Sequence, residues 1–127
     1  MMARILVVDD VPDARQLLAK VLRHAGHEPA VAASGPEALA HVRHARPDLF
    51  LLDVSMPGMS GFDVLQALRD EGALPGLPVF MLTAMSDADS RRRAMNLGAR
   101  DYFVKAGFDL GEMLARIAEV VGESPAA

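Results

Sequence analysis

Hydrophobic and polar positions follow two alternating patterns along the chain. Short runs of consecutive apolar residues are separated by longer segments whose apolar residues recur at three- and four-residue spacing. Consecutive apolar residues are typical of buried strands, and the longer spacing is typical of amphipathic helices. The expected strands are 5–8, 29–32, 49–52, 79–82 and 102–104. The expected helices are 12–25, 36–45, 61–71, 87–97 and 109–121.

The strands expected at 5–8, 49–52 and 79–82 have no polar face, because nearly every residue in them is apolar. Such strands are covered on both faces and are typical of the centre of a parallel sheet. Strands that are joined through helices form right-handed crossovers. The pattern therefore predicts an α/β fold, a doubly wound five-stranded parallel sheet with five helices on its two faces. Ligands of such sheets bind at the carboxyl ends of the strands.

Polar side chains stand where the expected strands end. Asp9 and Asp10 follow the first strand, Asp53 the third, Thr83 the fourth and Lys105 the fifth. Three carboxylates in one cleft repel one another, and a small hard cation is the simplest way to relieve that repulsion. Mg²⁺ fits best, because it prefers oxygen ligands and is held by one or two carboxylates. The sequence therefore predicts a magnesium site at this edge.

Asp53 is the best candidate for a nucleophile, because it follows the most apolar strand at the expected centre of the sheet. A carboxylate beside a cation can attack phosphorus and become an acyl phosphate. Lys105 would neutralise phosphoryl oxygens, and the backbone carbonyl of Ser55 could add a neutral metal ligand. Gly58 and Gly61 are expected to leave the loop open to an approaching ligand.

Composition narrows the possible functions. The 127 residues, 51% hydrophobic and 24% charged, have the length and balance of one folded domain. The lack of cysteine excludes disulfides, thiolate zinc sites and cysteine nucleophiles. A net charge of -4 argues against direct nucleic-acid binding, because phosphate contacts depend on a basic surface. No apolar run approaches the roughly 20 residues of a membrane span. We therefore expect a cytoplasmic protein without membrane contact.

Four motifs stand at the expected strand ends. They run from Val7 to Asp10, Leu51 to Gly61, Leu82 to Ala84 and Gly98 to Lys105. Together and in this order they resemble the receiver domain of bacterial two-component response regulators, the group that includes the chemotaxis response regulator. The resemblance covers about residues 3–121 and implies the flavodoxin-like strand order 2-1-3-4-5. We expect a receiver domain over 1–121 and a short tail or linker stub over 122–127.

The resemblance implies a role for the polar residues at the strand ends. Asp53 is the implied phosphoacceptor. Asp10 and Asp53 are implied direct Mg²⁺ ligands, whereas Asp9 acts mainly through water. The Ser55 carbonyl completes the protein ligands, and Lys105 binds the phosphoryl group. These roles assign Mg²⁺ as the cofactor and Asp53, Thr83 and Lys105 as the catalytic residues.

The resemblance also implies a switch. Thr83 donates a hydrogen bond to a phosphoryl oxygen and draws its loop inward, while Tyr102 moves from an exposed to a buried position. These movements change a surface formed by the fourth helix, fifth strand and fifth helix, about residues 86–121. A sensor histidine kinase, a phosphotransfer protein or acetyl phosphate is the implied donor. The changed surface binds a downstream target protein or an output domain.

One position departs from the family pattern. Family members usually carry proline after the lysine, joined by a cis peptide bond, whereas Lys105 is followed by Ala106 and Gly107. A cis bond before alanine would cost about 2.5 to 4 kcal/mol. We therefore expect a trans bond between Lys105 and Ala106, with Gly107 accommodating the altered path of the chain.

Two other function classes remain open on sequence alone. A magnesium-dependent phosphohydrolase of the haloacid dehalogenase type also has an aspartate nucleophile, but it needs a second acid where Ser55 stands. A flavodoxin-like nucleotide- or flavin-binding module has the same strand order, but it needs a Gly-, Ser- or Thr-rich loop after the first strand. The favoured interpretation is a signalling receiver, not an enzyme, that promotes its own phosphorylation and dephosphorylation. It is either a stand-alone protein or part of a longer one.

Overall fold

The computed structural model describes residues 2–123 and contains five strands that alternate with five helices. The strands are β1 Arg4–Val8, β2 Glu28–Ala32, β3 Leu49–Leu52, β4 Val79–Thr83 and β5 Asp101–Val104. The helices are α1 Pro12–His24, α2 Gly35–His44, α3 Gly61–Asp70, α4 Ala88–Leu97 and α5 Leu110–Glu123. Every predicted element is present. The expected tail begins inside α5, which continues to Glu123, and the rest of it, 124–127, lies outside the described residues.

The five strands form one parallel sheet in the order β2-β1-β3-β4-β5, as predicted. The register aligns the strand ends, because Val8 lies opposite Leu52 and Thr83 lies opposite Val104. The chain leaves β1 for β2 on one side, and β3 lies on the other side. The loops that follow β1 and β3 therefore diverge, which creates the crevice where open α/β sheets bind ligands.

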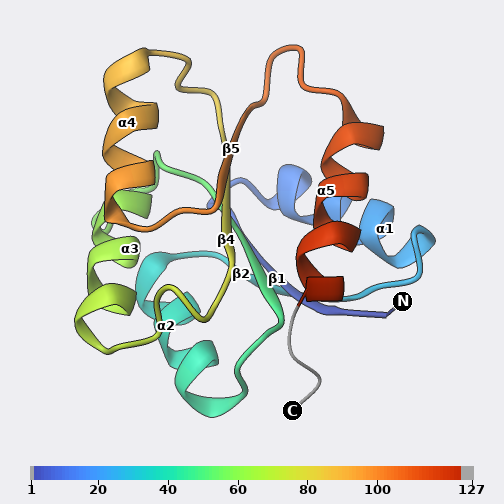
Figure 1. The fold of residues 1–127 in the computed structure, drawn as a ribbon, viewed down its shortest axis with the longest axis horizontal. Helices are drawn as coiled ribbons and strands as arrows, with labels where there is room; N and C mark the ends of the chain where they lie inside the picture. The colour runs from blue at the N-terminus through green and yellow to red at the C-terminus, as the bar shows by residue number, and fades with distance from the viewer. Residues whose placement is uncertain (1, 124–127) are drawn as a thin grey trace.

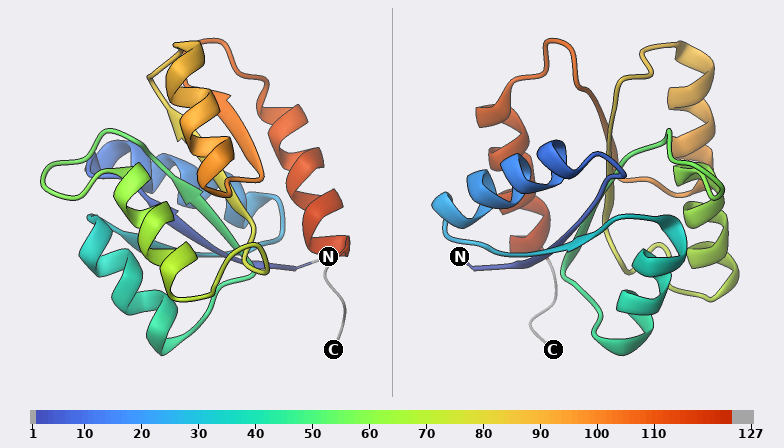
Figure 2. Two further views of the ribbon diagram at one scale, coloured as in Figure 1. Left: turned by 60° about the vertical axis from the view of Figure 1, so that its left-hand side comes forward. Right: turned by 180° about the vertical axis from the view of Figure 1, so that it is seen from behind.

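The helices form a layer on each face of the sheet. Figure 1 shows α1 and α5 on one side and α2, α3 and α4 on the other, and the views in Figure 2 agree. The strands run upward in Figure 1, so the loops that follow β4 and β5 lie at its upper edge. This arrangement explains the strands without a polar face, because both faces of the central strands are covered.

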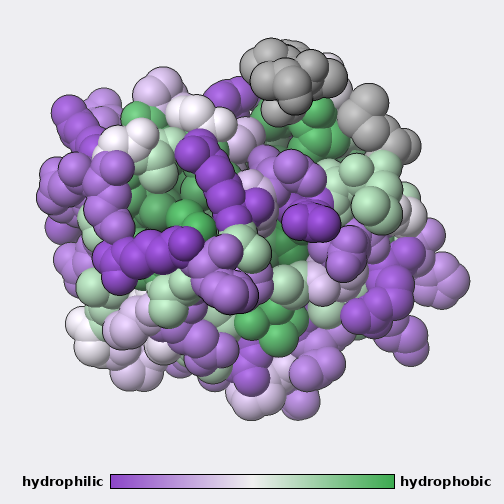
Figure 3. All heavy atoms as spheres, turned by 90° about the horizontal axis from the view of Figure 1, so that it is seen from below, coloured by the Kyte–Doolittle hydropathy of each residue, from purple (hydrophilic) through white to green (hydrophobic). Residues whose placement is uncertain are grey.

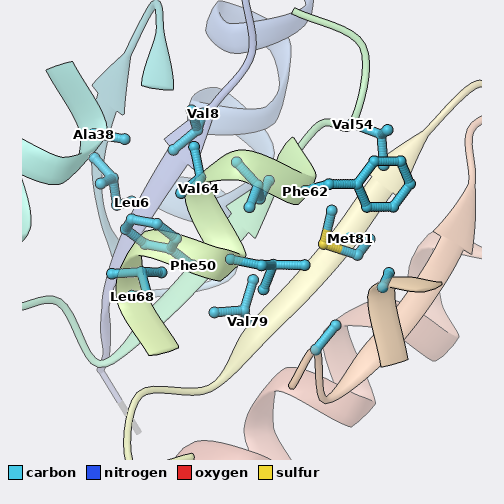
Figure 4. Close-up of a cluster of buried hydrophobic side chains, with 14 of the residues drawn as sticks. Leu6, Val8, Ala38, Phe50, Val54, Phe62, Val64, Leu68, Val79 and Met81 are labelled. Carbon is cyan, nitrogen blue, oxygen red and sulfur yellow. The ribbon is translucent and has the colours of Figure 1, made fainter. Parts of the chain in front are cut away.

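Alternate residues of the central strands enter two separate cores. Leu6 and Phe50 pack with α2, α3 and α4 in the core that Figure 4 shows. Ile5, Val7 and Leu49 point to the opposite face, where they pack with α1 and α5. All five side chains are almost completely buried. Because each core holds its helices against the sheet, the strand ends form a rigid platform for the loops.

Side-chain caps fix the starts of four helices. Ser34, Ser60 and Asp87 precede α2, α3 and α4, and each accepts a hydrogen bond from a backbone N–H in the first turn. Asp109 precedes α5 and accepts from the Glu112 N–H at 3.1 Å. α1 differs, because Val11 precedes it and offers no side-chain cap. Pro12 at the start of α1 suits this position, because its backbone has no N–H that would need a partner.

Hydrophilic side chains predominate on the face that Figure 3 views from below, with hydrophobic patches between them. The large apolar side chains that are exposed include Val11 and Leu17 near the start of α1 and Leu110 at the start of α5. Among the described residues, no helix has the length and hydropathy required to cross a membrane.

Candidate functional site

The carboxyl edge of the sheet brings together the polar residues that the sequence analysis places at strand ends. Asp9 follows β1 and Asp53 follows β3, and the Asp53 backbone N–H donates to the Val8 carbonyl at 3.0 Å. Asp9 is 2% exposed and Asp53 is 6% exposed. Buried carboxylates are rare unless they are paired or bind a metal. Their burial marks this edge as the candidate site.

Three carboxylates form a cluster that could hold a metal ion. Asp9, Asp10 and Asp53 each offer one oxygen, and these three oxygens lie within 4.8 Å of one another. The Lys105 ammonium contacts two of the acids, at 2.7 Å from Asp9 Oδ2 and 3.2 Å from Asp53 Oδ2. Three acids facing one ammonium leave an excess of negative charge. The oxygen-only donor set and this excess fit a small hard cation such as Mg²⁺.

The carboxylates differ in how many contacts they already make. Asp9 Oδ1 accepts from the Val11 N–H at 2.9 Å, and Asp9 Oδ2 accepts from Lys105. Asp53 Oδ1 accepts from the Ser55 N–H at 3.2 Å, and Asp53 Oδ2 accepts from Lys105. Within residues 2–123, Asp10 makes no side-chain hydrogen bond or ion pair. Asp10 therefore presents the carboxylate that is freest to bind a cation directly.

The Ser55 backbone faces the same crevice. Its N–H is used by Asp53, whereas its carbonyl accepts no hydrogen bond from any residue in the described part of the chain. Ser55 is exposed. The Ser55 carbonyl therefore has no hydrogen-bond partner within residues 2–123, and its role as a metal ligand stays a prediction.

Lys105 is half-buried at the centre of this charge cluster. Burial by itself lowers the pKa of the Lys105 ammonium, but the hydrogen bonds and negative charges of Asp9 and Asp53 together raise its pKa above the ordinary value. Lys105 therefore keeps its positive charge throughout the physiological pH range. The predicted trans bond between Lys105 and Ala106 is confirmed, and Gly107 adopts a φ of 88° in open space.

The two glycines of the loop after β3 have different roles. Gly58 has a φ of 79°, and a Cβ atom added there would meet nothing within 4 Å, which agrees with an open loop. The expectation for Gly61 is wrong, because a side chain there would lie 2.3 Å from the Asp53 carbonyl oxygen. The start of α3 thus packs against the Asp53 backbone. Gly61 permits that close packing and not the approach of a ligand.

The two candidate switch residues both contact Met85. Thr83 Oγ1 accepts from the Met85 N–H at 3.3 Å, and the Tyr102 hydroxyl donates to the Met85 carbonyl at 2.7 Å. Tyr102 is 3% exposed, so the structure shows the buried of its two implied positions. Burial raises the pKa of Tyr102, and the nearby Asp87 charge raises it further. Tyr102 thus remains protonated and can donate this bond.

Arg15 is a residue near the site that the sequence analysis does not include. Its Nη1 atom donates to the Asp9 carbonyl oxygen at 2.9 Å. The sequence carries no clear signal for it. Arg15 is the fourth residue of α1, past the positions where the helix dipole disfavours a cation most.

A known family matches most of the chain. The model of the response regulator receiver domain family matches residues 5–118 of the chain. This range contains every candidate site residue. It also covers well over half of the 127 residues.

Related sequences and structures give the same result. The DNA-binding response regulator MtrA of Mycolicibacterium smegmatis is 44% identical over 117 residues, which are 92% of this chain and 50% of that protein. The chain therefore spans about half the length of this relative. The structure is similar to the Vibrio cholerae chemotaxis protein CheY4, with a TM-score of 0.85, 35% identity and coverage of 94% of this chain and 99% of that one.

A second similar solved structure is that of a complex with magnesium. The response regulator TrrA of Thermotoga maritima, in complex with Mg(2+)-BeF, has a TM-score of 0.81 and 35% identity, over 92% of this chain and 97% of that chain. A magnesium ion is thus bound to a protein that has this fold.

Proposed function

The chain belongs to the response regulator receiver domain family, and from that membership we propose that Asp53 accepts a phosphoryl group in a Mg²⁺-dependent step. The observation that supports this most directly is the cluster of Asp9, Asp10 and Asp53 around the Lys105 ammonium. Family membership also favours a receiver over the phosphohydrolase and the nucleotide-binding module.

The reaction requires a carboxylate oxygen that can reach phosphorus. An Asp53 carboxylate oxygen attacks the phosphorus atom, the new oxygen–phosphorus bond forms, and the bond to the donor breaks. The leaving group is the imidazole of a kinase histidine or the acetate of acetyl phosphate. Lys105 leaves its contact with Asp53 Oδ2 and binds a phosphoryl oxygen, which stabilises the developing charge. Asp9 retains its contact with the ammonium and keeps it near the reacting oxygen.

The residues around Asp53 would hold the metal. Asp10, Asp53 and the Ser55 carbonyl are the direct ligands in this proposal, because Asp10 and the carbonyl make no competing hydrogen bond with any residue of 2–123. Asp9 acts through water in this proposal, because Lys105 lies closer to Asp9 than to Asp53, at 2.7 Å against 3.2 Å, and occupies the Asp9 oxygen more firmly. When bound, Mg²⁺ neutralises phosphoryl oxygens and relieves the repulsion among the three acids.

In this proposal, Thr83 and Tyr102 transmit the change at Asp53 to the surface that binds the target. A phosphoryl group at Asp53 offers new acceptor oxygens, and the Thr83 hydroxyl donates to one of them. Thr83 then draws in the loop that contains Met85, which contacts Tyr102. The resulting change reaches the surface formed by α4, β5 and α5, about residues 86–121. That surface binds the target.

The proposed partners are proteins. A sensor histidine kinase or a phosphotransfer protein supplies the phosphoryl group, and a target protein or an output domain receives the signal. The relative MtrA is a DNA-binding response regulator about twice as long as this chain. We propose that the receiver itself, with a net charge of -4, makes no direct contact with nucleic acid. We also propose that it acts in the cytoplasm and promotes its own dephosphorylation.

Intact-mass measurement tests the proposal. The protein is incubated with acetyl phosphate and Mg²⁺, and wild type is compared with Asp53→Asn. Wild type gains the mass of one phosphoryl group, whereas the variant gains none, because the amide is not a nucleophile at neutral pH. An equal gain in both proteins would remove Asp53 from its role. Circular dichroism of the variant checks that it folds.

A further inference from the structure

We propose that Arg15 is a positioning residue for the metal, which orients Asp10 by holding the peptide that joins it to Asp9. This inference rests on the proposed function, because it concerns the same magnesium site. Arg15 is half-buried and lies in the second turn of α1. Its guanidinium donates to the Asp9 carbonyl oxygen at 2.9 Å.

The Asp9 carbonyl belongs to the peptide unit that ends at the Cα atom of Asp10. Because a peptide unit is planar, a hydrogen bond to its oxygen fixes the plane and limits the directions open to the next side chain. The Arg15 backbone N–H also donates to the Val11 carbonyl, at 3.1 Å. Arg15 therefore holds carbonyl groups on both sides of Asp10, one with its side chain and one with its backbone.

No other described contact orients the Asp10 carboxylate. Asp10 makes no side-chain hydrogen bond or ion pair within residues 2–123. The α1 helix has no side-chain cap, because Val11 stands at the N-cap position. Asp9, in contrast, is held at its backbone N–H by the Ala32 carbonyl and at both carboxylate oxygens. The Asp9 carboxylate also reaches past Asp10 to the Val11 N–H. The peptide plane that precedes Asp10, in contrast, is held only by Arg15 among the described residues.

The positioning role of Arg15 and its positive charge predict opposite effects on the affinity for Mg²⁺ when Arg15 is replaced. A cation near a divalent metal site repels the metal, so loss of the Arg15 charge alone would strengthen Mg²⁺ binding. Loss of the hydrogen bond would instead let the Asp10 carboxylate move, which weakens binding. Residues that orient metal ligands typically change metal affinity by roughly 10- to 100-fold when they are replaced. The direction of the change therefore separates the two effects.

Isothermal titration with Mg²⁺ alone, well below the unfolding temperature, tests the proposal. We expect Arg15→Met to bind Mg²⁺ roughly tenfold more weakly than wild type. We expect Arg15→Lys, which can still donate to the carbonyl, to recover most of that loss. Arg23→Met is the matched control, because Arg23 is an exposed cation in the last turn of the same helix. The Mg²⁺ affinity of this control should match that of wild type.

A kinetic measurement separates positioning from general destabilisation. In phosphorylation by acetyl phosphate, Arg15→Met should need roughly tenfold more Mg²⁺ for half-maximal rate while it reaches the wild-type rate at saturating Mg²⁺. Affinity equal to or higher than wild type in Arg15→Met would overturn the proposal for Arg15 while leaving the metal site intact. Failure of wild type to bind Mg²⁺ would instead overturn the metal site and, with it, the proposed function.

Discussion

The two edges of the sheet hold their charged groups in different ways. At the carboxyl edge, the buried Asp9 and Asp53 share one half-buried ammonium, that of Lys105. At the amino edge, which lies toward the face in Figure 3, Asp48 is exposed and accepts the Arg4 backbone N–H at 2.8 Å. The buried polar group there is His27, whose Nδ1 atom accepts the Ala3 N–H at 3.1 Å.

This difference distinguishes polar groups that only stabilise the fold from polar groups that form a functional site. At the amino edge, His27 pairs with the backbone and Asp48 stays in water, at little electrostatic cost. The carboxyl edge gathers three acids against one ammonium, an arrangement that destabilises the free protein until a cation arrives. Unbalanced buried charge is therefore the feature that identifies the site, and removal of individual charges at each edge tests that view.

The largest effect is expected from the removal of the ammonium. Lys105→Met should slow phosphorylation by acetyl phosphate by about 100-fold, because a positive donor aimed at the phosphoryl oxygens is lost. Arg116→Met is the matched control. Its side chain is 31% exposed, as is that of Lys105, but it pairs with Asp101 away from the acid cluster. Rates are measured by intact mass over time, and equal slowing of both variants would contradict the role of Lys105.

A smaller effect is expected in stability when one acid of the cluster is neutralised. Asp10→Asn should raise the free energy of unfolding of the metal-free protein by about 1 kcal/mol, the scale of one repulsion between partly solvated charges. It should also abolish the rise in melting temperature that Mg²⁺ produces. Asp48→Asn, at the amino edge, should change stability by less than about 0.5 kcal/mol. Urea unfolding with and without Mg²⁺ measures both, and a loss of stability in Asp10→Asn would refute the repulsion.

The smallest effect is expected on the stability of the protein when His27 becomes protonated. Burial lowers the pKa of His27, and the positive N-terminus lowers it further, relative to the ordinary 6.5. The folded protein therefore binds fewer protons than the unfolded chain, so its stability is complete above pH 6.5 and falls as the pH drops through the folded pKa. Protonation of His27 in the folded state would also break the hydrogen bond that its Nδ1 atom accepts from the Ala3 N–H. In His27→Asn, the asparagine side chain can still accept a hydrogen bond but does not titrate. The stability of this variant should therefore not fall as the pH drops.

Most of the fold follows from the chain's own pattern of residues. The 49–52 strand is predicted with its observed bounds, because a run buried on both faces ends abruptly where Asp53 begins. Helix ends differ by one or two residues, because final turns fray and depend on contacts made in the folded state. The acid cluster is predictable because parallel strands end at the same edge.

Details of the site depend on distances between elements in the folded protein, and a local pattern of residues does not determine these distances. The close packing of Gly61 on Asp53 is set by the angle at which α3 leaves the loop. The contact between Arg15 and the Asp9 carbonyl is likewise set by the direction of α1. The sharing of Lys105 between Asp9 and Asp53 requires atomic positions at the ends of three strands. Sequence patterns predict which residues meet, but not which atoms they bond.

The most direct test of the central claim locates the phosphoryl group. After reaction with acetyl phosphate and Mg²⁺, borohydride reduction converts an aspartyl phosphate into homoserine, which tandem mass spectrometry of the peptides assigns to one position. We predict homoserine at position 53 and at no other aspartate, and none when Mg²⁺ is omitted. Homoserine at position 9 or 10, or unreduced aspartate at all three positions in a fully phosphorylated sample, would contradict the assignment of Asp53.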